Sequence, residues 1–453
     1  MHTGKKAEEL WSHRSVFILA LLGSSAGLGN IWKFPYLTGE QGGGTFLLVY
    51  LFCVLLVGVP IMMAEVLLGR RTRSNPVQAF QHLSEEAGAS PRWVWIGWLA
   101  ILTGVLIFSF YAVVAAWIFY YVFSLSTGLL ADIGVDQAGE YFGAMLKDPG
   151  SLLMSHSLFM LLILGILAAG VRRGLDRAIR YLMPLLFLLL LILLVYAYNS
   201  GHFMRAYYYL FAFHPGRVDA SMFIAALGHA FFTLSLGMGA VMTYGAYLSR
   251  KESIGQTVAC VGMLDTVLAL LVGMVVFPII FAAQMEPSSG PGLLFITLPV
   301  AFGQMDAGQV LCVIFFLLVG VAAVTSAISL MEPATVLLEQ RYGLKRPAAA
   351  LGSVGLAWLL SLAVLFSFSH FSGITLLEMN LFELLNFVTT YLLLPLVGLV
   401  ITLFTGWVLC RRITQDELSQ SLVLYYLWRF CLRYLAPLAI GLIFVTNLYN
   451  VSF

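Results

Sequence analysis

Two stretches of small residues interrupt apolar runs of this chain and expose backbone groups there. Residues 23–30 read Gly-Ser-Ser-Ala-Gly-Leu-Gly-Asn, and residues 233–239 read Thr-Leu-Ser-Leu-Gly-Met-Gly. A helix broken inside a bilayer leaves carbonyl and amide groups without partners, which is unfavourable unless something binds them. Free carbonyl oxygens suit a cation and free amide protons suit a carboxylate. The breaks therefore predict a solute-binding site at the bilayer midplane.

Asp265 is the ionisable residue that points most clearly to a bound cation. It lies in the middle of the apolar run 262–271, Gly-Met-Leu-Asp-Thr-Val-Leu-Ala-Leu-Leu. Burying a carboxylate in a membrane helix is unfavourable and implies a cationic partner. A hydrogen bond within a helix bundle is the alternative explanation. His229 is ambiguous in a similar way, since it is either a packed core histidine or a proton partner of Asp265.

The elements that position these residues must be membrane-spanning helices. Of the 453 residues, 60% are hydrophobic and only 10% are charged, whereas soluble domains carry about 25% charged residues. Hydropathy predicts an all-α polytopic membrane protein with eleven transmembrane helices, the first and the sixth of them broken. We place the helices at residues 14–38, 43–69, 92–126, 153–170, 176–199, 219–249, 254–283, 307–339, 347–368, 379–410 and 433–450.

The two breaks fall in the first helix of two successive five-helix sets. Because five is odd, the second set has inverted topology, and the chain is predicted to contain a 5+5 inverted repeat. We expect a single transmembrane transporter domain over residues 1–453. Its first repeat covers about 14–199, its second about 219–410, and an extra helix covers about 433–450. A Pro/Gly-rich segment at 286–299 is expected to be re-entrant or to form a packed lid.

The lysines and arginines predict how the chain crosses the membrane. If the N-terminus is cytoplasmic, 20 of the 24 basic residues fall on the inner side. The outer side then keeps Lys33, Lys147, Arg205 and Arg217. This positive-inside bias predicts a multi-pass protein of the inner (plasma) membrane with a cytoplasmic N-terminus and an outer C-terminus. The distribution of basic residues is thus explained by membrane topology, and no nucleic-acid partner is expected. We see no cleavable signal peptide.

Motifs spaced from residue 11 to about 407 carry a family resemblance. They are 23–35 (Gly-Ser-Ser-Ala-Gly-Leu-Gly-Asn-Ile-Trp-Lys-Phe-Pro), 42–46 (Gly-Gly-Gly-Thr-Phe), 58–60 (Gly-Val-Pro), Glu65, Gly69-Arg70, 231–239, Thr325-Ser326 and 331–333 (Met-Glu-Pro). The set resembles the neurotransmitter:sodium symporter family, in its bacterial eleven-helix amino-acid transporter branch with the leucine-transporter fold. The resemblance implies a sodium-coupled symporter that works by alternating access in a lipid bilayer.

The resemblance implies two sodium ions, which prefer hard oxygen ligands. The first ion takes the Ser25 carbonyl, the Asn30 side chain, Thr233 and Asp265. The second takes the carbonyls of Gly23, Ala26 and Ala322 and the hydroxyls of Thr325 and Ser326. Ordinary helix packing is the alternative for those two hydroxyls. In chloride-requiring relatives, the position that matches Asp265 resembles an asparagine, and a nearby chloride supplies the negative charge. Here the carboxylate supplies the negative charge, so no chloride requirement is expected, and sodium is the only metal.

The resemblance also implies the substrate contacts. The amides of Leu28 and Gly29 and the Tyr111 hydroxyl hold a carboxylate, and the carbonyls of Phe232, Thr233 and the Ser235 region hold an ammonium. Monoamine carriers have an aspartate where this chain has Gly27, which favours an α-amino acid. The remaining lining is Ser25, Ile107, Val114, Met238, Ser326 and Leu330. This apolar lining with a flexible methionine fits a neutral, hydrophobic or aromatic side chain.

Residues on the outer side of this site are expected to close it. The resemblance assigns this role to Tyr111 and Phe232, with Lys33 as the basic partner of an acid on helix ten. The matching position on helix ten holds Asn386, and Glu383 lies a turn away. Either Lys33 pairs with Glu383 or the outer gate is weaker than in relatives.

On the inner side, Trp11 is similar to the family's aromatic plug. Glu8 and Gln340 occupy the positions of the usual ion pair, so Lys5 or Lys6 with Glu339 is the expected substitute. Gly174 and Pro184, with nine residues between them, weaken the start of helix five. They predict that this end unwinds to open a water path to the second sodium, with a static proline kink as the alternative.

Three other functions stay open at this point. The substrate is alternatively another zwitterion, such as an osmolyte or a γ- or β-amino acid. A membrane sensor that binds an amino acid without moving it is a second alternative, although no signalling domain supports it. An enzyme is the weakest alternative, because the sequence shows no metal-ligand spacing and no nucleophile–base set. The sequence leaves the oligomeric state undetermined.

Overall fold

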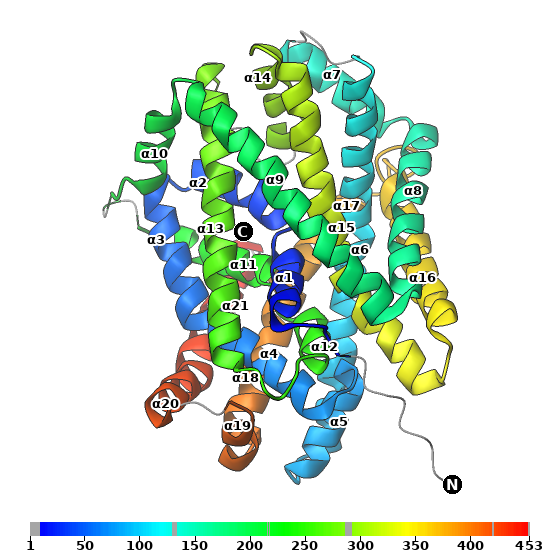
Figure 1. The fold of residues 1–453 in the computed structure, drawn as a ribbon, viewed down its shortest axis with the longest axis vertical. Helices are drawn as coiled ribbons and strands as arrows, with labels where there is room; N and C mark the ends of the chain where they lie inside the picture. The colour runs from blue at the N-terminus through cyan, green and yellow to red at the C-terminus, as the bar shows by residue number, and fades with distance from the viewer. Residues whose placement is uncertain are drawn as a thin grey trace.

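The computed structural model describes residues 10–128, 134–214, 216, 218–285, 292–418 and 421–451. Helices make up nearly all of this described part, and its one β contact is an isolated bridge between Leu376 and Met379. Most of the long helices run roughly along one axis of the molecule and surround two short central ones, α1 and α11 (Figure 1). The prediction of an all-helical chain is confirmed.

The first half of the chain begins with a broken helix and continues with long spans. Its elements are α1 (Arg14–Ser25), η1 (Gly29–Lys33), α2 (Phe34–Glu40), α3 (Gly44–Cys53), η2 (Val54–Gly58), α4 (Val59–Thr72), α5 (Pro76–Glu86), η3 (Pro91–Trp93), α6 (Val94–Ser126), α7 (Val135–Leu146), α8 (Pro149–Ala168), η4 (Val171–Asp176), α9 (Arg177–Asn199) and α10 (Phe203–Phe211).

The second half also begins with a broken helix. Its elements are α11 (Ala220–Thr233), α12 (Ala240–Ala246), α13 (Ile254–Ala282), η6 (Leu293–Thr297), α14 (Leu298–Gly303), α15 (Gly308–Tyr342), α16 (Arg346–Phe366), α17 (Leu381–Phe387), η7 (Val388–Leu393), α18 (Leu394–Leu403), η8 (Phe404–Val408), α19 (Arg411–Leu418), α20 (Leu422–Phe430), η9 (Cys431–Leu435) and α21 (Ala436–Val451).

Eight of the described helical runs are long and apolar enough to cross a membrane, and a bent pair makes a ninth candidate. Several follow the predicted spans closely: Pro91–Ser126 was expected at 92–126 and Gly308–Tyr342 at 307–339. The sixth predicted helix is divided into α11 and α12, each too short to qualify by itself. The count of eleven and the boundaries of the two repeats therefore stay predictions.

Both predicted breaks are present. In the first, residues 14–25 and 29–40 meet at an angle of 53°. In the second, Gly237 and Gly239 adopt φ values of +75° and +74°, which glycine tolerates without strain, and Ser235 has φ +53°. The extended Glu65 side chain accepts a hydrogen bond from the Gly237 amide at 2.7 Å. A carboxylate from a neighbouring helix thus stabilises the second break.

The segment after α13 packs against the bundle. Residues 286–291 of the predicted lid lie outside the described residues, whereas η6 and α14 form two short helical turns. Phe295 of η6 is fully buried and stacks on Phe142 of α7, with ring centroids 5.2 Å apart. The Tyr121 hydroxyl donates to the Phe295 carbonyl at 2.9 Å. These contacts favour the packed lid over a loose linker.

Candidate functional site

Three serines connect the two unwound segments. Ser24 lies near the end of α1, Ser235 lies in the break between α11 and α12, and Ser329 lies on α15. Ser24 Oγ is 2.7 Å from Ser329 Oγ and 3.0 Å from Ser235 Oγ, and Ser235 donates to the Ser24 carbonyl at 3.0 Å. Side chains therefore satisfy part of the broken backbone, which reduces the number of polar groups left for ligands.

The predicted ligands of the first sodium lie together in a buried cluster. Asn30 Nδ2 donates to Asp265 Oδ1 at 2.7 Å, and Thr233 Oγ1 donates to Asn30 Oδ1 at 2.5 Å. Thr233 Oγ1 is also 3.2 Å from Asp265 Oδ2. The Tyr50 hydroxyl, which the sequence-based prediction missed, donates to Asp265 Oδ2 at 3.3 Å. The fourth predicted ligand, Ser25, ends α1, and its carbonyl accepts from the Gly27 amide at 2.8 Å.

Asp265 has neutral hydrogen-bond partners only. It is 0% exposed in the middle of α13, and within the described residues no Lys, Arg or His nitrogen lies within 4.0 Å of its carboxylate. A buried carboxylate without a protein cation favours binding of a small cation beside it. The surrounding oxygen atoms are the hard ligands that sodium prefers.

The residues predicted for the second sodium come from α1 and α15. Ser326 Oγ is 3.1 Å from the Gly23 carbonyl, and Thr325 Oγ1 donates to the Ala322 carbonyl at 3.0 Å. A Cβ added at Gly23 would lie 3.2 Å from Thr325 Cβ and 3.0 Å from Met183 Sδ of α9. Gly23 thus permits α1, α9 and α15 to converge. Ala26 caps the end of α1 and is fully buried.

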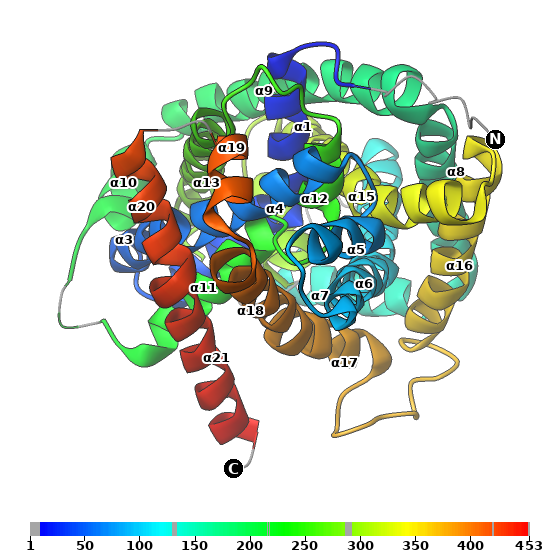
Figure 2. The ribbon, with the colours of Figure 1, turned by 90° about the horizontal axis from the view of Figure 1, so that it is seen from below.

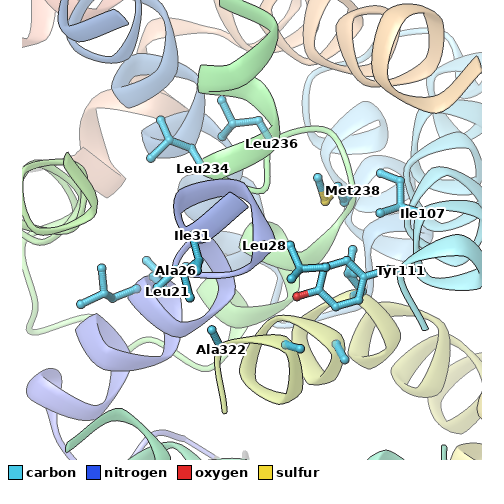
Figure 3. Packing of buried hydrophobic residues seen from close by; sticks show 14 of the residues in the cluster. Leu21, Ala26, Leu28, Ile31, Ile107, Tyr111, Leu234, Leu236, Met238 and Ala322 are labelled. Atoms are coloured by element: carbon cyan, nitrogen blue, oxygen red, sulfur yellow. The ribbon is translucent and has the colours of Figure 1, made fainter. Parts of the chain in front are cut away.

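A small central cavity of about 20 Å³ lies between the two breaks and α6. Figure 3 shows Tyr111 and Ile107 of α6 facing Leu28 at the broken first helix, with Met238 beside them. The structure brings together nearly all of the predicted substrate residues and adds Ser24. Two predicted residues lie outside this lining: Thr233 is in the sodium cluster, and Val114 lines the larger neighbouring cavity instead. The lining is Ser24, Ser25, Gly27, Leu28, Gly29, Ile107, Tyr111, Phe232, Ser235, Met238, Ser326 and Leu330.

Tyr111 and Gly27 define one end of the central cavity. The Tyr111 hydroxyl is buried and has no hydrogen-bond partner among the described residues. A Cβ added at Gly27 would lie 3.1 Å from that hydroxyl and 2.4 Å from Ser326 Oγ. Leu28 and Gly29 begin the second half of the broken helix, where the first amides lack intrahelical acceptors. The Tyr111 hydroxyl and these amides are donors suited to a carboxylate.

Comparison with known proteins agrees with this geometry. The model of the sodium:neurotransmitter symporter family matches residues 8–133 and 138–453. The chain belongs to this family. An uncharacterized sodium-dependent transporter of Bacillus subtilis, YhdH, is 31% identical over 451 residues, with 98% of both chains covered. The symporter described here is therefore a polytopic membrane transporter that depends on sodium, and its relatives are not enzymes.

Two further relatives bear on the substrate. The crystal structure of MhsT in complex with L-phenylalanine matches this symporter with a TM-score of 0.88 and 38% identity, over 97% of this chain and 99% of MhsT. A sodium- and chloride-dependent taurine transporter of the dog is 24% identical over 440 residues, covering 83% of this chain and 70% of its own. The MhsT match supports the fold, because its TM-score and coverage are both high.

On the side predicted to face outward, a larger cavity of about 300 Å³ adjoins the central cavity, and Tyr111 and Phe232 line both. The Lys33 ammonium lies 4.7 Å from the centroid of the Phe232 ring. The expected Lys33–Glu383 ion pair is not formed: Glu383 instead caps α17 by accepting from the Asn380 amide at 3.0 Å. Asn386 accepts from Thr390 at 3.2 Å. Glu383, the predicted acidic partner of Lys33, is instead used in the cap of its own helix.

Trp11, which the resemblance assigns as an aromatic plug, is buried against α12 and the segment after it. Its side chain is 7% exposed and packs edge-on against Tyr244 and Tyr247, with centroids 5.3 and 6.0 Å away. The indole donates to the Tyr244 carbonyl at 3.2 Å, and the Trp11 amide donates to the Tyr247 carbonyl at 3.2 Å. These bonds fasten the start of the chain to the segment after α12.

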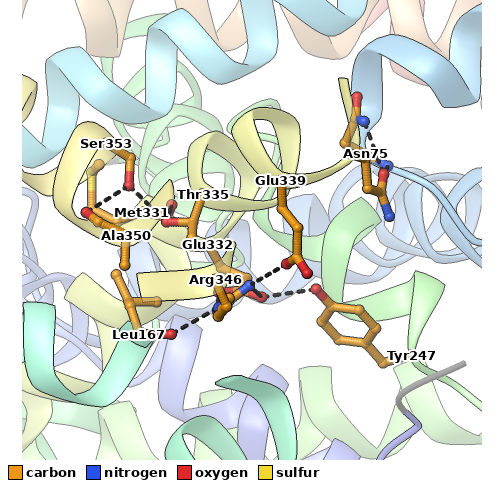
Figure 4. Close-up of polar contacts among 11 residues, drawn as sticks. Asn75, Leu167, Tyr247, Met331, Glu332, Thr335, Glu339, Arg346, Ala350 and Ser353 are labelled. Carbon is orange, nitrogen blue, oxygen red and sulfur yellow. Dashed lines mark hydrogen bonds and ion pairs between the residues drawn. The ribbon is translucent and has the colours of Figure 1, made fainter. Parts of the chain in front are cut away.

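An ion pair between Arg346 and Glu332 lies beside this plug, and the sequence-based prediction did not include it. Arg346 pairs with both oxygens of Glu332, which is fully buried, and Glu332 also accepts from the Tyr247 hydroxyl at 2.8 Å (Figure 4). Arg346 donates to the Leu167 carbonyl at 2.8 Å. Glu339 lies 3.7 Å from Arg346. Arg346 thus provides a basic partner near Glu339. Lys5, Lys6 and Glu8 lie outside the described residues, so their expected pairing stays a prediction.

Gln340, which occupies one position of the family's usual ion pair, contacts Asn75. Its Oε1 accepts from the Asn75 amide at 2.8 Å and from Asn75 Nδ2 at 2.9 Å. Asn75 in turn caps α5 by accepting from the Gln78 amide. Because an amide carries no charge, this contact joins α15 to the start of α5 without an ion pair.

The start of helix five is wound in this structure, so the predicted unwinding is not observed. Residues Val171–Asp176 form one π-helical turn that continues into α9, and Pro184 lies inside α9. A Cβ at Gly174 would lie 2.0 Å from the Ile166 carbonyl, so only glycine permits this packing. Asp176 accepts from the Ser12 amide at 3.1 Å and pairs with Arg180 at 2.7 Å. These contacts hold the turn closed, and its unwinding stays a prediction.

His229 packs among aromatic rings. It is 1% exposed, and its ring centroid lies 5.1 Å from Tyr50 and 5.9 Å from Phe34. Neither ring nitrogen has a hydrogen-bond partner among the described residues. The histidine reaches Asp265 only through the Tyr50 side chain, which favours the packed core histidine over a direct proton partner.

Proposed function

We propose that this symporter imports a neutral, hydrophobic or aromatic α-amino acid together with two sodium ions. The observation that carries the proposal is the central cavity, which has carboxylate donors at one end and apolar side chains elsewhere. Tyr111 OH and the first amides of the re-started helix supply the donors, and Ile107, Met238 and Leu330 supply the apolar walls. The complex of the relative MhsT with L-phenylalanine supports this substrate class.

Two sodium sites follow from the two polar clusters that flank the cavity. The Asp265 cluster holds a fixed negative charge next to the substrate position, so the first ion contacts the substrate carboxylate. The second cluster, at Gly23 and Thr325, contributes neutral oxygens only and lies against Met183 of α9. The Asp265 cluster thus couples sodium binding to the substrate. The cluster at Gly23 and Thr325 couples sodium binding to helix packing.

Transport is proposed to be independent of chloride and to run inward by alternating access. Asp265 supplies the negative charge at the first sodium site, where Tyr50 and Thr233 hydroxyls already converge on its carboxylate. The positive-inside bias places the N-terminus in the cytoplasm of the inner membrane and the C-terminus outside. Opening of the Trp11 plug then releases the substrate to the cytoplasm.

Binding and uptake together test this function. A thermal-shift screen of the twenty amino acids should show a rise in melting temperature for apolar and aromatic ones only when sodium is present. Proteoliposomes should then accumulate the best ligand with sodium, equally in chloride and in gluconate. Uptake that needs chloride would overturn the proposed chloride independence, and binding without uptake would favour a sensor. Selective binding of taurine or a γ-amino acid would favour another zwitterion.

Gly27→Ala provides the matching structural test. The added methyl group would collide with Ser326 Oγ at 2.4 Å and approach the Tyr111 hydroxyl, so substrate binding should fall at least about tenfold. Gly165→Ala on α8 is the control, because a Cβ there meets no atom within 4 Å. Unchanged binding in Gly27→Ala would exclude this end of the cavity as the carboxylate position.

A further inference from the structure

A pocket rich in arginine and tyrosine lies at the end of the molecule formed by α5, α19 and α20, far from the central cavity (Figure 1). It has a volume of about 480 Å³ and opens between α19 and the run of α20 and η9. Figure 2 shows α19 and α20 side by side at this end. We call it the basic–aromatic pocket; its arginines and tyrosines are Arg411, Arg429, Arg433, Tyr425, Tyr426 and Tyr434.

The three arginines have no carboxylate partner. Among the described residues, no Asp or Glu oxygen lies within 4.0 Å of any of them. Arg429 is used structurally, since it donates to Tyr425 OH at 2.5 Å and to the Leu409 carbonyl at 3.1 Å. Arg411 and Arg433 each bond to the protein through Nε, to Gln415 and to the Gly406 carbonyl. Their terminal nitrogens are left for another acceptor.

Aromatic rings fix the orientation of these two guanidinium groups. Arg411 lies 4.9 Å from the ring centroid of Tyr426, and Arg433 lies 5.1 Å from that of Trp407. The Trp407 indole also donates to the Arg433 carbonyl at 3.3 Å. Stacking of this kind holds the planar guanidinium group in place, so less side-chain entropy is lost when the arginine binds an anion.

The side of α20 that faces away from the protein is apolar. Leu422, Val423 and Leu427 are 53%, 77% and 57% exposed, whereas Tyr425 and Trp428 on the opposite side are buried. A helix with one exposed apolar side next to arginines is typical of the membrane interface. The proposed orientation puts this end at the cytoplasmic leaflet, where anionic lipids are found.

We propose that the basic–aromatic pocket binds the phosphate-bearing headgroup of an anionic phospholipid. The terminal nitrogens of Arg411 and Arg433 match phosphate oxygens in pairs. Exposed apolar side chains at the rim, Phe430 and Tyr434, lie where acyl chains would leave the headgroup. The apolar rim favours a lipid over free phosphate as the ligand of this pocket. The inference uses the proposed orientation but not the proposed substrate.

Native mass spectrometry of the full-length protein in a non-ionic detergent tests the proposal, with phosphatidylglycerol as the probe and phosphatidylethanolamine as the neutral comparison. The double variant Arg411→Gln/Arg433→Gln should bind phosphatidylglycerol about tenfold more weakly and leave phosphatidylethanolamine binding unchanged. Arg250→Gln/Lys251→Gln is the matched control. It removes the same charge from two exposed residues at the same end of the molecule, and its lipid binding should stay within twofold of wild type.

Three results would overturn the proposal. They are equal phosphatidylglycerol binding by wild type and the double variant, an equal loss in the Arg250→Gln/Lys251→Gln control, and full displacement of the lipid by the same concentration of inorganic phosphate. If the double variant does not fold, Tyr426→Leu replaces it. Tyr426 is 51% exposed, so its loss should leave the core intact and still weaken phosphatidylglycerol binding about threefold. Unchanged binding in that variant would equally contradict the proposal.

Discussion

The two ends of the central cavity are closed by different chemistry. The inner side is held by a buried ion pair between Arg346 and Glu332 and by hydrogen bonds from Trp11. The outer side is covered by Tyr111 and Phe232, with Lys33 placed over a ring and without an ion pair. Buried charge pairs separate only when something replaces each partner, whereas aromatic rings move by side-chain rotation. Under the proposed orientation, we therefore expect inner opening to be the more demanding step of transport.

Substitution of Glu332 should have the largest effect on transport. In Glu332→Gln, Arg346 loses its buried partner, and breaking such a pair costs about 3–5 kcal/mol. Sodium-driven uptake into proteoliposomes should fall at least about tenfold, with a lower melting temperature. Glu86→Gln is the control, because its pair with Arg71 lies at the surface, where it contributes about 1 kcal/mol or less. Equal effects of the two variants would remove the distinction between the ends.

Phe232 is the outer counterpart. Its ring separates the two cavities and lies 3.2 Å from the position of a Cβ on Gly29. Phe232→Ala should raise the KM for the substrate about tenfold, equivalent to about 1.4 kcal/mol, with a smaller change in kcat. Phe232→Tyr keeps the ring and should stay near wild type. A loss of kcat at constant KM would show that Phe232 controls inner release instead.

Trp11 permits a graded test of the inner side. Trp11→Phe keeps an aromatic ring but loses the indole hydrogen bond to the Tyr244 carbonyl, which is worth about 1 kcal/mol. Uptake should fall about fivefold, and more in Trp11→Ala, which also loses the edge-on ring contacts. Accessibility of the central cavity to a membrane-permeant thiol reagent, read at a cysteine introduced at Ser24, should rise in the same order. Faster uptake in Trp11→Phe would contradict the plug.

Lys33 should give the smallest effect. Because Lys33 touches the Phe232 ring and no carboxylate, Lys33→Gln removes a cation–π contact of about 0.5–2 kcal/mol and should reduce uptake about threefold. Glu383→Gln should be additive with it in a double-mutant cycle. A coupling energy above about 1 kcal/mol would mean that the two residues pair in another state of the cycle.

Some features followed from short stretches of sequence. The breaks at 23–30 and 233–239 were predictable because glycine and serine mark interrupted helices locally, and Asp265 was informative because a carboxylate stands out in an apolar run. The family resemblance then assigned nearly all of the cavity lining residue by residue. Tyr50, Ser24 and Ser329 were missed, since a single hydroxyl in an apolar helix looks the same whether it is packed or functional.

The amino-acid sequence alone was sufficient to predict a helical membrane transporter of the sodium:neurotransmitter symporter family and most of the residues that line its cavity. How the cavity is closed depends on contacts that form only in the folded protein. Glu332 and Arg346 lie on different helices and meet only after α15 and α16 pack together, and Glu383 is drawn to its own helix cap instead of to Lys33. Apolar patterning is read along the chain, whereas the choice among competing polar partners depends on distances in three dimensions.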